Sequence, residues 1–524
     1  MTRSTAQDTP KPDRFALWVA VVTLGAALLR FTRLDAQSIW IDEGMSIAWI
    51  DVIASDGLQV LLHNIHGPLH AVAVYATSRI SESEWWLRLP SAVAGVLTLP
   101  LLAHVGRRWW GERVGLTAAT LLALAPFALY YAQEVRGYAF AILFATTTLA
   151  AAWAFAARPR VGAVVGLVVS ETLGILSNLN GIFLALGVGG WLFVRLRQER
   201  RALLLWFVAH AVAVVALLPY ALRANPQVRP ERLVGVASDI GESEPLRGGT
   251  TLHPMSLPYT AYAFAAGYSL GPTLEELRAD PGAAAQARHL PGLLLVVIGF
   301  GVPLVAGVTS RKAWPAAGLA FAVTASVVSF TLWLAATNMK PYNVRYLSVL
   351  LPLFLLFCAY GLWRLRRGWR FVAACAALTV SVWSCSNYLF VPRYGRDDTR
   401  GVVAYLLENA APEDLVLHIN LGYSLAYYDQ LPQRIRLAGS GSGASRAAAR
   451  AYLDTILDGV GTLWYLESRP EKLDPHAHLR DACGERASES ETSHFVGIRV
   501  HRFELQPGPE PGAGRPSRSD SAGL

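Results

Sequence analysis

Two adjacent carboxylates, Asp42 and Glu43, stand in the stretch SIWIDEGMS, residues 38–46, directly after the first apolar run of the chain. A carboxylate in a suitable position can take the proton from a hydroxyl nucleophile as a general base, which typically accelerates a reaction about 10²–10⁴-fold. A second explanation for the pair is structural, because acidic side chains stabilise the first turn of a following helix. The catalytic role is the one predicted here.

Three further stretches combine cations and aromatic rings, and two of them also contain an acid. Arg and Lys can hold a phosphate that leaves with its negative charge, and aromatic side chains such as Trp40 and Trp85 offer flat faces for a sugar ring. Such a set suits group transfer from a membrane-anchored phosphate donor. The stretches are SEWWLRLPSA with Glu84 and Arg88, YYAQEVRGYA with Gln133, Glu134, Arg136 and Tyr138, and NMKPYNVRY with Lys340, Arg345 and Tyr346.

Each of these charges also has a structural explanation. Glu134 and Arg136 could form an ordinary ion pair in a tight turn. Arg88 could extend its charged end to the membrane surface while its stem lies on apolar residues, and Arg345 has a similar alternative.

The histidines of HNIHGPLH raise the question of a metal. His63, His66 and His70 have a spacing that suits one helical face, and Glu43 could complete a zinc site. Gly67 and Pro68, however, interrupt that helix. A divalent metal is therefore an alternative, and no cofactor is required by the residues.

Composition places these residues in a membrane protein. The chain has 524 residues, of which 53% are hydrophobic and only 16% charged, so a polytopic α-helical protein is predicted. A spanning helix needs roughly 17–25 residues. Eleven apolar runs are long enough, at 15–33, 86–106, 114–132, 139–157, 161–179, 181–195, 202–222, 290–309, 313–337, 346–363 and 371–391.

The links between the runs alternate in charge. Alternate links, among them GRRWWGER and RLRRGWR, together hold fifteen Lys and Arg against two acids, Glu112 and Glu199. Basic links face the cytoplasm, so residues 1–14 are predicted inside and everything after residue 391 outside, across the plasma (inner) membrane. The net charge of +8 therefore reflects topology, and nucleic acid is excluded as a partner.

Three outer segments follow from this threading. Residues 34–85 hold the acid pair and two amphipathic stretches, SIAWIDVIASDGLQVLL and GPLHAVAVYATSRI, predicted to lie on the membrane surface. Residues 223–289 are rich in Pro and Gly and contain a capping box at Thr273 and Glu276. Residues 392–505 alternate helical and strand patterns, which predicts an extracytoplasmic α/β domain. Its strands are expected in DLVLHIN, GTLWYLES and FVGIRVHRFEL, and residues 506–524 are predicted to be disordered.

The order of WIDE, HGPL, EWWLRLPS, YYAQEVRGY and KPYNVRY resembles the GT-C superfamily. Within it, residues 14–160 and the later VRYLSVLLP are similar to glycosyltransferase family 39, which includes protein O-mannosyltransferases and lipid A aminoarabinose transferases. The resemblance implies a polyprenyl-phosphate sugar donor, inversion at the transferred sugar and an active site at the outer leaflet.

The resemblance implies a role for individual residues of this chain that match the family's motifs. Asp42 matches the catalytic base, Glu43 its support or an acceptor ligand, and Glu134 the acid of the second outer loop. Arg88, Arg345 and Lys340 are expected to hold the donor phosphate. His66 matches the His of a His-Pro-Pro motif, but here the second position is Gly67. Relatives carry Thr-His where this chain has SNLNGIF, with Asn178 and Asn180. Substrate contacts are also expected from Gln133, Arg136, Tyr138 and Tyr346.

The prediction is thus a membrane glycosyltransferase that transfers a sugar from a polyprenyl phosphate to an extracytoplasmic protein, glycan or lipid. A transporter or lipid flippase would show inverted repeats and ionisable residues near mid-membrane. No repeat is visible, and Glu171 is the one acid within a predicted span. A non-catalytic assembly factor of the same fold is a further alternative, against which the intact acid pair argues.

Overall fold

The computed structural model describes residues 14–63, 67–223, 252, 254–271, 287–337, 340, 342–439, 441–470 and 473–506. These residues form two compact units. The first combines the chain up to Gln37 with Met45–Gly395, and the second combines Ser38–Gly44 with the chain from Arg396 onward. The short segment that carries Asp42 and Glu43 therefore belongs to the same unit as the C-terminal domain.

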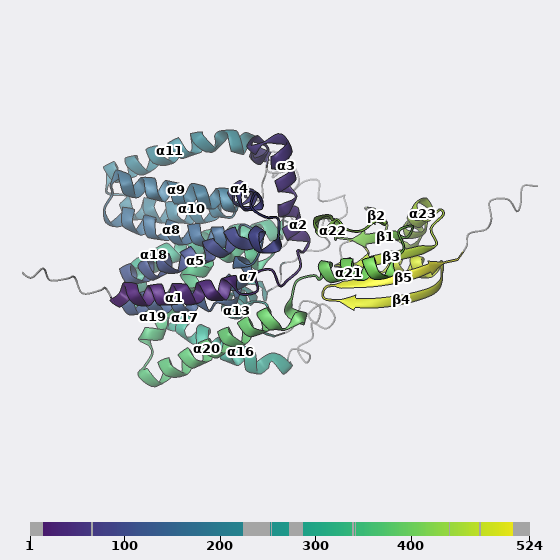
Figure 1. Cartoon of the computed structure of the whole chain (residues 1–524). Helices are drawn as coiled ribbons and strands as arrows, with labels where there is room; N and C mark the ends of the chain where they lie inside the picture. Colours follow the sequence, from purple (N-terminus) through teal and green to yellow (C-terminus); the bar gives the residue numbers. More distant parts are fainter. Residues whose placement is uncertain are drawn as a thin grey trace, which may run out of the picture. The chain divides into compact units, whose positions relative to one another are not determined.

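The first unit is a bundle of apolar helices (Figure 1). Helices long and apolar enough to cross a membrane number eight in the described residues, or nine if the bent pair α6–α7 is one span, and α9 and α10 are shorter apolar helices. All eleven predicted runs fall on helices, although their count as spans stays a prediction. The helices are α1 (Arg14–Phe31), α5 (Glu84–Trp110), α6 (Glu112–Ala123), α7 (Pro126–Ala132), α8 (Tyr138–Ala157), α9 (Val161–Ser177), α10 (Gly181–Leu196), α11 (Arg200–Arg223), α13 (Ser256–Ala266), α16 (Leu290–Val296), α17 (Val302–Val308), α18 (Trp314–Ala336), α19 (Leu351–Arg364) and α20 (Arg367–Phe390).

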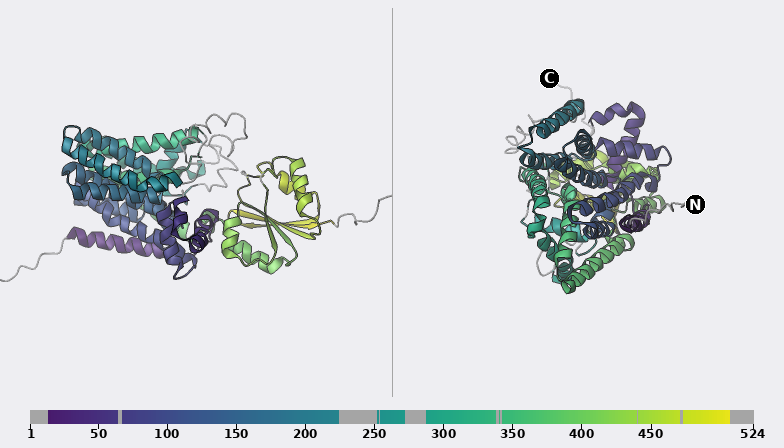
Figure 2. Two further views of the ribbon diagram at one scale, coloured as in Figure 1. Left: turned by 90° about the horizontal axis from the view of Figure 1, so that it is seen from above. Right: turned by 90° about the vertical axis from the view of Figure 1, so that its left-hand side faces the viewer.

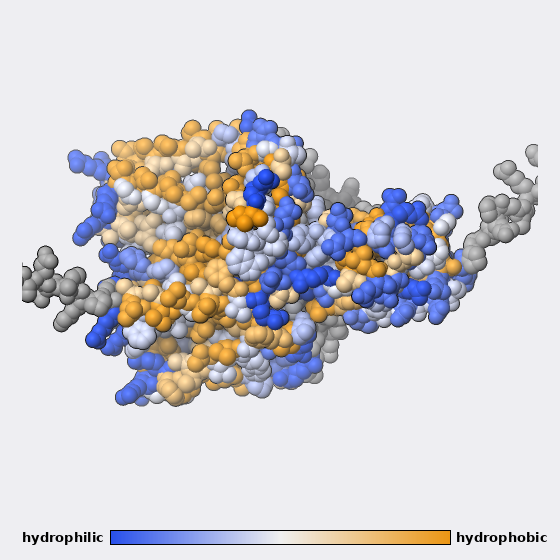
Figure 3. All heavy atoms as spheres, viewed as in Figure 1, coloured by the Kyte–Doolittle hydropathy of each residue, from blue (hydrophilic) through white to orange (hydrophobic). Residues whose placement is uncertain are grey.

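Several spans are less regular than their sequences suggest. The run predicted at 290–309 is α16 and α17 joined by the π-helix η4 (Val297–Gly301). The run at 346–363 begins with a 3₁₀ helix, η6 (Val344–Leu350), before α19. Short 3₁₀ turns also precede or follow spans, at η3 (Ala287–His289), η5 (Arg311–Ala313) and η7 (Pro392–Tyr394). Figure 3 shows apolar side chains over much of the viewed face of this bundle, as expected for a surface against lipid.

A buried arginine stabilises the bend between α6 and α7. Pro126 has no N–H, so it cannot donate to the carbonyl of Leu122 one turn earlier. Arg30 of α1 provides further donors at the bend: its Nη2 lies 3.0 Å from the Leu122 oxygen, which also accepts the Ala125 N–H at 3.3 Å, and its Nη1 lies 3.1 Å from the Ala123 oxygen. The two helices bend by 59° at this break. Arg30 is completely buried, so it serves the fold of the bundle.

The first outer segment is helical. The first amphipathic stretch begins in the last two residues of α2 (Ile41–Ile47) and forms α3 (Trp49–Asp56) and most of the 3₁₀ helix η1 (Leu58–His63), and the second forms α4 (Pro68–Ser78). Their predicted position on a membrane surface stays a prediction. The capping box at Thr273 and Glu276 lies outside the described residues.

The second unit contains a five-stranded mixed sheet with the strand order β2-β1-β3-β5-β4. Strands β1, β2 and β3 are parallel, and β5 pairs antiparallel with β3 and β4. Strands β1 (Leu415–Ile419), β3 (Thr462–Glu467) and β5 (Ile498–Leu505) fall on the three predicted strand sequences, while the edge strands β2 (Arg434–Leu437) and β4 (Ala487–Phe495) were not predicted. The helices are α21 (Thr399–Asn409), α22 (Gly422–Tyr428), α23 (Arg446–Ile456) and α24 (His478–Gly484).

Helices cover both faces of this sheet (Figure 2). On one face, Val416 and Trp464 pack with α21 and α22 through Leu406 and Leu425. On the other face, alternate strand residues such as Leu417 pack with α23 and α24. The alternation follows from the two-residue period of a strand. The domain is therefore a three-layer α/β structure.

The buried His418 of β1 predicts a pH-dependent stability for this domain. Burial lowers the pKa of His418 to about 4, below its ordinary value of 6.5. The unfolded chain therefore takes up a proton that the folded domain excludes as the pH falls from about 6.5 to 4, and the folded state loses at most about 3 kcal/mol over that window. Above pH 6.5 the effect is absent.

We expect the unfolding temperature of the full chain in detergent to fall between pH 7.5 and pH 5, and we expect His418→Leu to reduce that fall. His494→Leu is the matched control, because His494 is exposed on β4. An equal fall in the two variants would contradict the assignment to His418.

Candidate active site

Arg88 fixes the chain just before the acid pair. Its side chain is completely buried, and its Nη1 donates to the carbonyl oxygens of Leu34 and Gln37 at 2.9 and 2.8 Å. The same nitrogen lies 3.6 Å from Glu84 Oε2, one turn earlier on α5. Arg88 thus binds residues 34–37 from a buried position. A side chain that reached to the membrane surface would instead be exposed at its charged end. Its contact with a donor phosphate stays a prediction.

The tight turn between α7 and α8 holds three predicted residues. Gln133 Nε2 donates to the carbonyl oxygens of Arg30 and Thr32, each at 2.9 Å, so it anchors the end of α1. Glu134 is almost fully buried. Arg136 Nη1 donates to Ser46 Oγ at 3.2 Å, near the end of α2. The turn therefore binds the chain at two places, at the end of α1 and at Ser46, which lie on either side of residues 38–44 in the sequence.

Gly67 explains why the motif after His66 departs from His-Pro-Pro. Its φ is +102°, a conformation that proline cannot adopt, and a Cβ at this position would overlap the carbonyl oxygen of Ser177. Gly137 approaches the same oxygen equally closely. Glycine is thus required at both positions by the end of α9. His66 itself lies outside the described residues.

Two cations and two aromatic rings gather at η6. Arg345 Cζ lies 5.8 Å from the ring centroid of Tyr138 and 5.6 Å from that of Tyr346. Lys340 Nζ lies 4.2 Å from the Tyr346 centroid. Tyr138 belongs to α8, so the cluster brings together residues that are about 200 positions apart in the chain. We call Tyr138, Lys340, Arg345 and Tyr346 the cation–aromatic cluster.

Two asparagines hold this cluster in place. The Asn343 Oδ1 accepts the Arg345 N–H at 3.2 Å and so caps η6. Asn180, from the SNLNGIF stretch, donates through Nδ2 to the carbonyl oxygen of Tyr346 at 3.2 Å, and its own N–H binds Asn178 Oδ1. The departure from Thr-His in this stretch therefore supplies a polar connection to η6.

The acid pair, Asp42 and Glu43, belongs to the second unit. Glu43 is completely buried, and its Oε1 lies 3.8 Å from Arg396 Nη1. The indole ring of Trp40 faces the Arg469 guanidinium at 4.7 Å from the ring centroid. The pair thus lies within a cluster of charges from the C-terminal domain and is more than a solvated helix start.

Asp397 adds a third carboxylate to this cluster. Its Oδ2 lies 3.2 Å from Arg469 Nη2 and accepts a hydrogen bond from Ser468 Oγ at 3.4 Å. Burial raises the pKa of Asp397, the Arg469 charge lowers it, and the neighbouring negative charge of Asp42 raises it further.

Sequence reasoning did not find Arg396, Asp397 or Arg469. The stretch RYGRDDTR directly after the last apolar run was the available signal, because three cations and two acids follow one another there beside a membrane. Arg469 follows β3 within an ordinary loop sequence, which gives no such signal.

The described residues contain no group of three or more His, Cys, Asp and Glu that could hold a metal ion. His70 Nε2 lies 3.2 Å from Ser91 Oγ, and its ring packs edge-on against Phe140. His63 ends η1. His66, the third histidine weighed for zinc, lies outside the described residues, so a metal there stays a prediction.

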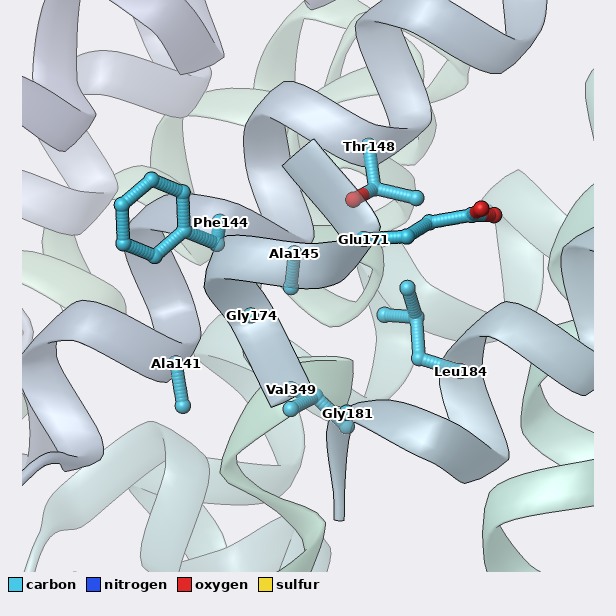
Figure 4. A pocket seen from close by; sticks show the side chains of 9 residues that line it. All are labelled: Ala141, Phe144, Ala145, Thr148, Glu171, Gly174, Gly181, Leu184 and Val349. Atoms are coloured by element: carbon cyan, nitrogen blue, oxygen red, sulfur yellow. The ribbon is translucent and has the colours of Figure 1, made fainter. Parts of the chain in front are cut away.

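Glu171 pairs with a neighbouring helix. Its Oε2 lies 2.7 Å from His210 Nε2 of α11, while His210 Nδ1 donates to the Trp206 carbonyl oxygen at 2.8 Å. Because Nδ1 carries a proton, one further proton is shared between Glu171 and Nε2. Figure 4 shows Glu171 among the residues that line a hollow between α8, α9, α10 and η6. Its other lining residues are Ala141, Phe144, Ala145, Thr148, Gly174, Gly181, Leu184 and Val349.

The helical bundle and the α/β domain together have the fold of the GT-C membrane glycosyltransferases, so the chain is an integral, multi-pass membrane protein of that fold. The resemblance predicted from the sequence is confirmed. Residues 65–222 match the family model described as dolichyl-phosphate-mannose-protein mannosyltransferase.

Two solved structures illustrate the likeness. The crystal structure of ArnT from Cupriavidus metallidurans in the apo state matches with a TM-score of 0.58 and 15% identity, over 93% of this chain and 98% of that one. The oligosaccharyltransferase of Archaeoglobus fulgidus, crystallised with zinc and sulfate, matches with a TM-score of 0.52 and 12% identity, over 92% of this chain and 72% of that one. No curated protein sequence matches the chain.

Proposed function

We propose that this protein transfers a sugar from a polyprenyl-phosphate donor to an extracytoplasmic protein, glycan or lipid. The observation that carries the proposal is the cation–aromatic cluster. Arg345 and Lys340 lie on the rings of Tyr138 and Tyr346 at the start of an apolar span. A planar guanidinium and an ammonium beside aromatic faces suit a phosphate bound to a sugar and to a lipid chain.

The reaction follows from the roles of the side chains. The acceptor hydroxyl gives its proton to the Asp42 carboxylate, and its oxygen forms a bond with the anomeric carbon of the sugar. The bond from that carbon to the phosphate oxygen breaks, and the electron pair leaves with the polyprenyl phosphate. Arg345, with Lys340 and Arg88, offsets the charge that develops there. Glu43 supports Asp42, Glu134 is a further acid of the site, and Gln133, Arg136, Tyr138 and Tyr346 contact substrate.

The orientation in the membrane belongs to the same proposal. The basic links between spans support an N-terminus in the cytoplasm and an α/β domain outside, with the protein in the plasma (inner) membrane. The donor would then be met at the outer leaflet. Transport is the second candidate function, and the Glu171–His210 pair favours it, because ionisable side chains among apolar helices often mark a path across the membrane.

The test is donor consumption by the purified full chain in liposomes that contain radiolabelled polyprenyl-phosphate hexose, pentose or amino sugar. We expect one donor class to be consumed, with free polyprenyl phosphate as a product. A parallel assay follows movement of the labelled lipid between the leaflets. Lipid movement without consumption of any donor would overturn the transferase proposal in favour of transport.

A further inference from the structure

The C-terminal domain has a topological switch point, the position at which open α/β sheets usually bind ligands. The chain leaves β1 toward α22 on one face of the sheet, and it leaves the adjacent parallel strand β3 toward α24 on the opposite face. Loops that diverge in this way open a crevice at the carboxyl ends of the two strands, which is the usual ligand position in open α/β sheets.

In this protein the crevice is occupied by the chain's own segment Ser38–Gly44, here called the acid segment. Gly44 lies directly on the backbone that follows β1: a Cβ there would be 2.6 Å from the carbonyl carbon and oxygen of Tyr423. Trp40 faces Arg469, two residues after the end of β3. The acid segment thus contacts the loops after both strands.

Backbone and hydroxyl groups fix the other end of the acid segment. Ser38 Oγ donates a hydrogen bond to Asp398 Oδ1 at 2.7 Å. Ser38 Oγ also accepts a hydrogen bond from the Arg400 N–H at 3.2 Å. The Ile39 N–H binds the hydroxyl oxygen of Tyr428 at 2.9 Å. These groups come from the start of α21 and the end of α22, so the segment is held at both ends.

The charges of the crevice are arranged around the two acids. Arg396 lies beside Glu43, and Asp397, which is bound by Arg469, interacts with Asp42. Asn420 in turn fixes the loop of Arg469, because its Nδ2 lies 3.3 and 3.2 Å from the carbonyl oxygens of Ser468 and Arg469. Glu43 thus has a cation beside it, while Asp42 lies near a carboxylate that is itself bound by Arg469.

We propose that the C-terminal domain is a clamp that positions Asp42 for catalysis, with Arg396 and Arg469 as positioning residues and the acid segment as the intramolecular occupant of its crevice. This inference rests on the proposed function, in which Asp42 is the base. A general base must lie within hydrogen-bond reach of the proton it takes, and small displacements of reacting groups cost about 10²-fold in rate. Loosening the clamp should therefore slow the chemical step without removing the donor site.

Gly44→Ala tests the clamp. The added Cβ would meet the Tyr423 backbone, so the acid segment must leave its place. We expect amide hydrogen exchange across residues 38–44 to rise at least about tenfold, kcat to fall about 10–100-fold, and the donor KM to stay within about threefold. Gly25→Ala on α1 is the matched control, since no atom lies within 4 Å of a Cβ there, and it should change none of the three.

Arg469 provides a readout that a merely structural role would not change. The charged groups that contact the acid segment or Asp397 in this unit are Arg396, Asp398 and Arg469, and the segment's own second acid is Glu43. Arg469→Gln removes a cation that offsets the carboxylates, so the acid limb of kcat/KM should move to higher pH. Arg469→Lys should restore the limb.

The outcomes separate this inference from the proposed function. If Gly44→Ala raises exchange but leaves kcat unchanged, the clamp is not needed for catalysis and the inference is overturned while the transferase stands. Unchanged exchange in Gly44→Ala would show that the acid segment does not depend on this contact, which also overturns it. If the wild type consumes no donor, the proposed function fails, and hydrogen exchange still reports whether the segment is bound.

Discussion

Asp42→Asn should abolish most sugar transfer while the protein still binds its lipid donor. Asparagine keeps the size and the hydrogen-bonding reach of the side chain but cannot take a proton, so we expect kcat to fall about 10²–10⁴-fold. The measurement is single-turnover release of radiolabelled polyprenyl phosphate, with equilibrium binding of the donor measured separately. Binding should change less than about threefold, because no role in holding the phosphate is assigned to Asp42.

Asp51→Asn is the matched control for this substitution. Asp51 is exposed on α3 and lies nine positions along the same outer segment. It should transfer sugar at the wild-type rate. A similar loss in both variants, or full activity of Asp42→Asn, would contradict the assignment of Asp42 as the base. Glu43→Gln would not decide the question, since Glu43 is buried beside Arg396 and its loss would leave that arginine without this carboxylate.

Local sequence patterns predicted much of the fold, because each spanning helix and each buried strand carries its own signal. The apolar runs coincide with helices, and the runs around Val416, Trp464 and Val500 became the central strands. The edge strands β2 and β4 gave no such signal. All four residues of β2 are exposed, and the middle of β4, from Glu489 to Thr492, is exposed and polar, so neither strand shows the alternation on which the prediction depends.

Irregular helices were harder to predict for a different reason. The bend at Pro126 depends on which groups bind the carbonyls of the turn before the proline. Here one of the donors is Arg30, which is about 90 positions earlier in the chain. No local pattern predicts that partnership, although the proline itself is visible in the sequence.

The candidate site shows the same division between local and distant information. The sequence identified Asp42, Arg345 and Tyr138 from their types and from the motifs around them. It could not show that Arg345 lies on Tyr138, or that Arg396 lies beside Glu43, because hundreds of residues separate the partners. The pairing of Glu171 with His210 likewise joins α9 and α11, and the sequences of the two helices do not show that they lie side by side.

Arg345→Gln should reduce kcat/KM about 100-fold and weaken binding of polyprenyl phosphate itself. A charge-assisted hydrogen bond from a guanidinium is worth about 1.5–3 kcal/mol, and the leaving phosphate gains charge as the sugar departs, so both binding and turnover should suffer. Arg345→Lys keeps the charge but loses the planar group that lies on Tyr138 and Tyr346, and it should recover only part of the activity.

Arg311→Gln is the control for this prediction, because Arg311 is an exposed arginine in the link before α18 and no site role is assigned to it. It should bind and turn over the donor as the wild type does. The decisive comparison is binding of polyprenyl phosphate without a sugar. If Arg345→Gln binds it as tightly as Arg311→Gln, the arginine does not contact the phosphate, and the cation–aromatic cluster would serve to hold η6 against α8. If only Arg345→Gln loses binding, the cluster is the phosphate site, and the charge at this position supports both ground-state binding and departure of the lipid.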